Sequence, residues 1–148
     1  MADIVSNFFN KKRDEVAEVQ QDITKTTLDT LFEFSPHLHD PYSKFAKGEY
    51  EINHKVSIND SEPSQHHPPA SLSGSSAAIS QEDLREHIEK EKDISNGIEC
   101  GDAVGIFNTT KHAVAVETGN DPMWVKEGYH TYTLTRDSIK LRYKNVLK

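Results

Sequence analysis

The feature that most limits the folds open to this chain is an uninterrupted amphipathic stretch near its start. Residues 4–34 contain no glycine and no proline, and Pro36 lies just beyond them. Apolar and small neutral side chains recur in this stretch at intervals of three, four or seven residues: Phe9, Val16, Val19, Ile23, Thr27, Leu31 and Phe34. That spacing is typical of one face of an α-helix. We predict one helix over residues 4–34, which ends before Pro36 because the residue preceding a proline avoids helical backbone angles.

The start of this predicted helix carries further apolar residues whose role the sequence leaves open. Ile4, Val5 and Phe8 lie N-terminal to the basic and acidic cluster at residues 11–15. They either cover the core or serve a contact outside the domain. Phe8 and Phe9 are therefore candidate interface residues.

The clearest strand pattern follows a loop predicted at residues 35–49. Between residues 50 and 59, apolar, aromatic and histidine side chains alternate strictly with polar ones. This alternation predicts a strand with one buried face and one polar face. Such a strand needs an antiparallel partner. His54 falls on the buried face, where we expect a hydrogen-bonded core histidine.

A second helix is predicted at residues 80–94. Ser80 is a favourable N-cap, and Asn96-Gly97 favours an end to the helix or a tight turn. Leu84 and Ile88 would supply a narrow apolar edge. The residues expected to face solvent are Glu86, Glu89, Lys90 and Glu91.

The C-terminal third is predicted to hold the rest of the sheet. An apolar run at 103–107 and a Thr- and Tyr-rich run at 129–135 favour strands, and the segment between them favours a strand or a short helix. Asp137 is expected to cap a final helix. These elements predict an α+β fold: a long N-terminal helix and shorter helices packed on one side of a small, mainly antiparallel β-sheet.

The 148 residues fit one domain, 1–148, by their length. Hydrophobic residues make up only 34% of the chain, so part of it is expected to stay outside the core. Residues 60–79, rich in serine and proline, are predicted to form a flexible loop or arm that orders against a neighbouring subunit. No apolar run approaches the roughly 18 residues that a membrane span needs, and no secretory signal is recognised, so we expect an intracellular protein without membrane contact.

Charge is distributed unevenly. The net charge is −7, with −7 on residues 60–102 and +3 on residues 103–148. An acidic chain argues against general binding to nucleic-acid phosphates. The basic concentration near the end includes Arg136, Lys140 and Arg142, which either form a solvated helix face or complement an acidic neighbouring subunit.

No catalytic or metal-binding pattern is recognised in the sequence. His37-x-His39 could supply two zinc ligands, but no third ligand follows at a fixed spacing, so we expect no metal and no cofactor. His66-His67 falls in the predicted arm and is expected to be solvated. Cys100 lies close to Glu99 and Asp102, whose charges disfavour a thiolate nucleophile. We therefore expect a protein that is not an enzyme.

Two stretches carry a resemblance to a known family. In residues 103–119 an apolar run ends at Asn108, His112-Ala113 follows, and Glu117-Thr118-Gly119 closes the segment. Upstream, Ser35-Pro36 follows the long helix, and Val56-Ser57-Ile58-Asn59 lies within the predicted strand. The order and spacing of these motifs resemble the tail-completion, or head–tail joining, proteins of tailed bacteriophages. The Thr-Gly-Arg element of that family is absent here.

The resemblance implies a structural virion protein of the phage neck. It implies a six- or twelve-fold ring of subunits that joins the head to the tail and extends the DNA channel. The implied neighbours are portal or head-completion proteins, the tail tube or tail terminator, and genome DNA passing nearby without specific contacts. The implied location is the virion, with assembly in the host cytoplasm.

A contact surface is expected around the only tryptophan. Trp124 lies in a predicted loop with Pro122 and Met123, and a lone loop tryptophan is either an interface anchor or a core residue. Other functions stay open at this stage: another connector or tail-terminator subunit, a small acidic adaptor whose helix at 80–94 binds a basic partner, or an enzyme or metal protein.

Overall fold

The computed structural model describes residues 2–35, 49–60, 80–110, 113–119 and 128–146, and the following account concerns these ranges. The predicted arm at 60–79, apart from residue 60, and the predicted Pro122–Trp124 contact lie outside them, as do His37, His39 and the His66-His67 pair.

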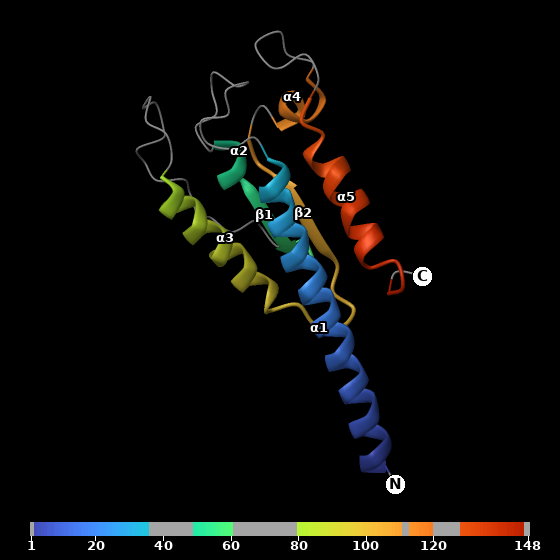
Figure 1. Ribbon diagram of the computed structural model, residues 1–148. Helices are drawn as coiled ribbons and strands as arrows, with labels where there is room; N and C mark the ends of the chain where they lie inside the picture. The colour runs from blue at the N-terminus through green and yellow to red at the C-terminus, as the bar shows by residue number, and fades with distance from the viewer. Residues whose placement is uncertain (1, 36–48, 61–79, 111–112, 120–127, 147–148) are drawn as a thin grey trace.

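One long helix organises the molecule. Helix α1 spans Ala2–Phe34, so the predicted helix is confirmed and begins two residues earlier than expected. Helix α3 (Gln81–Ser95) and helix α5 (Thr131–Arg142) flank its C-terminal half on opposite sides, as Figure 1 shows. Ser80 caps α3 as predicted, because its side chain accepts a hydrogen bond from the backbone N–H of Asp83.

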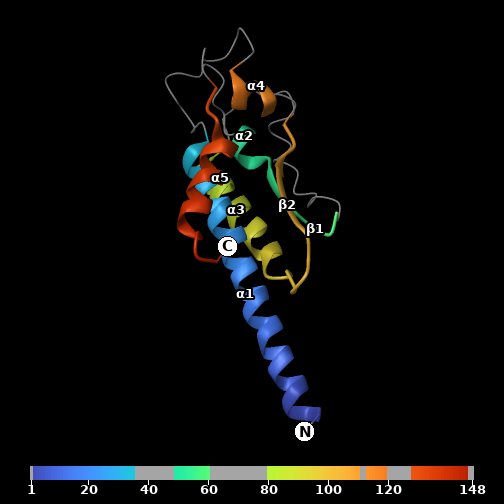
Figure 2. The same cartoon turned by 90° about the vertical axis from the view of Figure 1, so that its right-hand side faces the viewer.

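The sheet has two antiparallel strands. Strand β1 (His54–Ile58) pairs with β2 (Val104–Asn108), and His54 lies opposite Asn108 while Ile58 lies opposite Val104. Short helices adjoin both strands: α2 (Glu49–Ile52) precedes β1 and α4 (Ala113–Thr118) follows β2. Helices α1, α3 and α5 lie on one side of the sheet (Figure 2). The α+β class and the antiparallel partner of β1 are therefore confirmed.

The strand predicted at 50–59 begins later than expected. Residues 49–52 form one helical turn, because the carbonyl of Tyr50 accepts hydrogen bonds from the backbone N–H of Asn53 and from the side-chain amide of Asn108. The expected polar face is also wrong. Lys55 and Ser57 are buried, so β1 is covered on both faces.

The strand predicted at 129–135 is also wrong, since residues 131–142 form helix α5. Thr131, Thr135 and Ile139, spaced four residues apart, are buried, and this helical period overrides the strand propensity of threonine and tyrosine. Asp137 lies inside α5 and does not cap it.

The first turn of α5 is held by a side chain from α4. The Glu117 carboxylate accepts hydrogen bonds from the backbone N–H groups of Tyr132 (3.1 Å) and Thr133 (3.2 Å). A negative charge at this end of a helix is stabilising, because the free N–H groups there carry partial positive charge. Glu117 thus takes the place of a local cap, which His130 does not provide.

Polar side chains of α3 cover the free edge of β1. The imidazole Nε2 of His87 donates to the carbonyl of His54 (3.1 Å), and the backbone N–H of Val56 donates to Glu91 (2.8 Å). Glu91 is fully buried and lies 3.7 Å from the ammonium of Lys55. The expectation that Glu91 faces solvent is therefore wrong. Its carboxylate accepts the hydrogen bond from Val56 that the carbonyl of a third strand would otherwise accept.

None of the described helices has the length and apolar character needed to cross a membrane. The apolar centre lies around the C-terminal half of α1, where Leu28 and Leu31 are completely buried. Val56 of β1, Ile98 and Val116 of α4 are buried in the described core as well.

Candidate docking surface

The N-terminal half of α1 projects beyond the rest of the described molecule (Figures 1 and 2). The side chains of residues 2–16 are all exposed, and the first buried side chain of α1 is Thr24. Apolar residues nevertheless continue along this half: Ile4, Val5, Phe8, Phe9, Val16 and Val19, which we call the α1 stripe. Phe8 is 57% exposed and Phe9 is 61% exposed.

Local features of the sequence favour a helix in this projecting half, where contacts with the core do not. It contains no glycine or proline, and Asp3 lies in the first turn, where a negative charge is favourable. Lys12 and Glu15, three residues apart, form an ion pair at 2.6 Å. The hydrogen bond from Lys12 lowers the pKa of the Glu15 carboxyl.

The two phenylalanines form the most apolar part of the α1 stripe. Their rings meet edge to face with centroids 5.8 Å apart, and the Lys12 ammonium lies 6.0 Å from the centre of the Phe8 ring. Burying one such side chain contributes about 1.5–3 kcal/mol relative to leaving it in water. A partner that covers both rings would therefore gain substantial binding free energy.

The exposed stripe begins near the point where α5 stops covering α1. Tyr143, just after α5, donates its hydroxyl to the carboxylate of Asp22 at 2.6 Å. Farther along α1, Thr27 and Leu31 line a groove that faces α5. Val16 and Val19, on the other side of Asp22, are exposed. A partner on the α1 stripe would thus meet the end of α5.

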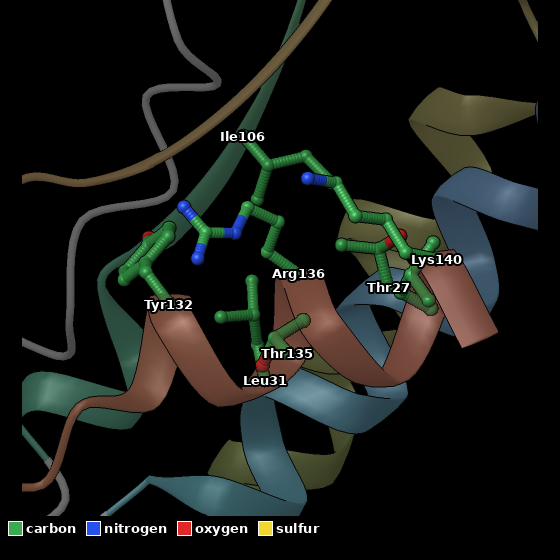
Figure 3. Close-up of a pocket in the computed structure, with 8 residues that line it drawn as sticks. Thr27, Leu31, Ile106, Tyr132, Thr135, Arg136 and Lys140 are labelled. Carbon is green, nitrogen blue, oxygen red and sulfur yellow. The ribbon is translucent and has the colours of Figure 1, made fainter.

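The predicted interface residues that the structure describes do not form one surface. Phe8 and Phe9 lie on the projecting helix, whereas Arg136, Lys140 and Arg142 are exposed on α5. Arg136 forms an ion pair with Asp137 at 3.1 Å. Arg136 and Lys140 line a groove of about 260 Å³ together with Ile106 of β2, as Figure 3 shows.

A chain of buried polar groups lies in the core around His54. Ser35 donates its hydroxyl to the carbonyl of Leu31 (2.6 Å), so the same hydroxyl accepts from the imidazole Nε2–H of His54 (2.8 Å). The unprotonated Nδ1 then accepts from the hydroxyl of Tyr132 (3.0 Å). His54 is thus the hydrogen-bonded core histidine that the sequence predicts.

This geometry does not prepare Ser35 for nucleophilic attack. The imidazole donates to the serine oxygen, whereas a general base has to accept its proton. Burial, with a smaller contribution from neighbouring His87, lowers the pKa of His54 to about 3. Burial also raises the pKa of Tyr132 well above its ordinary range. We interpret the His54 chain as structural.

The described residues also contain no group of three or more side chains placed to hold a metal ion. Cys100 is a free, exposed thiol. The His37-x-His39 pair lies outside the described ranges, so its predicted lack of a metal is not tested.

The sequence interpretation missed His87, Glu91 and the groove beside Ile106. His87, Glu91 and Ser95 recur every four residues and are buried in α3. This spacing is a detectable sign of one helix face, but polar side chains normally indicate a solvated face.

Comparisons with models of known protein families, with curated proteins and with solved structures find no match to this chain.

Proposed function

We propose that the chain is a structural subunit of the neck of a tailed bacteriophage, which works by docking rather than by catalysis. The observation that carries the proposal is the α1 stripe. Two adjacent phenylalanines lie exposed on a helix that projects from the described molecule. A clustered apolar surface of this kind marks a site of protein association.

Four described residues of the motifs that resemble tail-completion proteins have structural roles in this fold. Asn108 binds the carbonyl of Tyr50 at 2.7 Å, and Glu117 holds the first turn of α5. Gly119 has a positive φ of 70°, which favours glycine. Ser35 orients His54. Each of these four positions thus has a physical reason to keep its residue type.

The distribution of exposed charges between α3 and α5 supports a ring of subunits in this proposal. Helix α3 presents Glu82, Glu86 and Glu89 to solvent, the last two paired with Lys90 and Lys92 of the same helix. Helix α5 presents Lys140, and Arg136 paired with Asp137, on the opposite side of α1. Two different, complementary faces permit a head-to-tail contact that closes into a ring. We propose a six- or twelve-fold ring that binds portal-side and tail proteins, while its net negative charge of −7 disfavours tight contact with DNA in the channel.

The test replaces Phe8 and Phe9 with serine in the gene of the phage that encodes the chain. We expect the double variant to fold, because both side chains are exposed, but to leave heads and tails unjoined in electron micrographs of lysates. The matched control is Asn10→Ser/Asp14→Asn, which changes the opposite side of the same helix. Normal virions from the phenylalanine variant would contradict the proposal, as would equal loss in both variants.

A further inference from the structure

Strand β2 has one edge that the described protein leaves open. Within the described ranges the sheet consists of β1 and β2, and α3 covers the other edge of β1. A backbone hydrogen bond from the N–H of Thr109 to the carbonyl of Asn53 (3.1 Å) fixes which groups of β2 face its partner. Odd-numbered residues of β2 bond to β1, so the N–H and C=O groups of Val104, Ile106 and Asn108 point away from it.

Strand β2 itself carries none of the usual features that protect an edge strand against pairing. Natural edge strands carry a lysine, a proline or a bulge, or are covered by another element. Strand β2 reads Val-Gly-Ile-Phe-Asn, without charge or proline, and its register to β1 is continuous. No hydrogen bond to the outward backbone groups of Val104 or Ile106 is formed within the described ranges.

We propose that this edge binds β2 of a second copy of the chain, in an antiparallel pair centred on Ile106. In that register Ile106 lies opposite Ile106 of the other copy, and Val104 lies opposite Asn108. All three outward-facing residues of each copy are then paired. Moving the two-fold axis to residue 105 would place Asn108 opposite residue 102, and moving it to residue 107 would place Val104 opposite residue 110, in each case beyond the end of β2. Centring on Ile106 therefore pairs the most backbone groups.

Side chains favour the same register. Gly105 lies opposite Phe107 of the other copy, and a β-carbon at Gly105 would meet nothing within 4 Å. An aromatic ring across a strand glycine covers the backbone that the glycine exposes. No charged side chain of β2 meets its own copy.

The groove beside β2 provides space for the incoming strand. Residues directly opposite in an antiparallel pair point to the same face, so the second Ile106 lies on the groove side of the sheet. That groove, about 260 Å³, is lined by apolar groups of Leu31, Tyr132 and Ile139 as well as Ile106, and by the long side chains of Arg136 and Lys140 of α5 (Figure 3). A five-residue pair is a small interface, so we expect a weak dimer.

This inference does not depend on the proposed neck function. The contact has two-fold symmetry, whereas a neck ring requires a rotational, head-to-tail contact. We assign the dimer to the free subunit before assembly, in which it would hide an edge prone to nonspecific pairing.

Register-specific cross-linking tests the pair in the full chain with Cys100→Ser. Cα atoms of a hydrogen-bonded antiparallel pair lie about 5.5 Å apart, within the range that a disulfide spans. Ile106→Cys should therefore give a disulfide-linked dimer under mild oxidation. The matched control is Val104→Cys, whose two copies would lie roughly 14 Å apart at about 3.4 Å per residue. We expect cross-linking at residue 106 to be roughly tenfold faster or more.

Sedimentation equilibrium of the chain with its native cysteine gives an independent measurement. Both proteins compared should carry Phe8→Ser/Phe9→Ser, so that association through α1 does not contribute. Gly105→Lys, which the open space at that residue accommodates, should weaken the dimer about tenfold or more. Equal cross-linking at residues 104 and 106, no cross-linking, or an unchanged sedimentation profile would overturn the inference. None of these results would bear on head–tail joining.

Discussion

At the scale of single residues, Glu91 connects α3 to β1 within the core. Its carboxylate accepts from the backbone of β1 and lies beside Lys55, while its own backbone belongs to α3. Burial lowers the pKa of Lys55, and the neighbouring Glu91 charge opposes that shift. Removing the charge of Glu91 would therefore leave burial to lower the pKa of Lys55 without that opposition.

Replacing Glu91 with glutamine should reduce the free energy of unfolding by about 3 kcal/mol, because Lys55 would then face a neutral amide within the core. Urea denaturation at pH 7 measures the change. The control is Glu89→Gln on the exposed side of α3, with an expected change within about 0.5 kcal/mol. Similar effects for both variants would show that the buried pair does not stabilise the fold.

The neutral state of His54 makes stability depend on pH. In the unfolded chain this imidazole gains a proton below about pH 6.5, whereas in the folded protein it stays neutral until the pH approaches about 3. Stability from this group is therefore complete above pH 6.5 and falls as the pH decreases towards 3. By pH 5 the loss should reach about 2 kcal/mol, at about 1.36 kcal/mol per pH unit.

Nitrogen NMR of the imidazole tests this assignment directly. His54 should remain neutral at pH 5, with the proton on Nε2. A His54 resonance that titrates near pH 6.5 in the folded protein would contradict the buried, hydrogen-bonded state.

At the scale of elements, local pattern predicted some segments and tertiary contacts decided others. Helix α1 follows from its long apolar period, and α3 from its cap at Ser80. The first half of α5 was predicted as a strand because its threonines and tyrosine favour a strand locally, and only its second half falls in the final helix expected after Asp137. Contacts with α1 and the carboxylate of Glu117 make it helical, and neither is visible in the local sequence.

The candidate site was predictable only in part. Phe8 and Phe9 stand out from the sequence, yet their exposure depends on where α5 and the sheet end along α1. The buried role of Glu91 depends on the edge of β1, which no local pattern near residue 91 reveals.

The junction of α4 and α5 depends on a glycine. A β-carbon added to Gly128 would lie 2.1 Å from the carbonyl oxygen of Glu117, so Gly128→Ala must move the backbone. We expect a loss of about 1–3 kcal/mol in thermal or urea unfolding. Gly105→Ala, which meets open space, should change stability little. Equal stability of the two variants would exclude this close approach.

At the scale of the whole molecule, the described structure combines a folded body with a projecting helix. Helices α3 and α5 support only the C-terminal half of α1 (Figure 1). An isolated helix of this length is marginally stable in water, so we expect the projecting half to gain order when a partner covers the α1 stripe. The body would then position the stripe, and the stripe would make the functional contact.

Photo-cross-linking in assembled particles tests this central claim most directly. A benzophenone amino acid placed at residue 9 should cross-link to another virion protein, whereas the same group at Asp14, on the opposite side of α1, should give much less product. Mass spectrometry would identify the partner. A subunit missing from purified particles, or equal cross-linking from residues 9 and 14, would contradict docking through the α1 stripe.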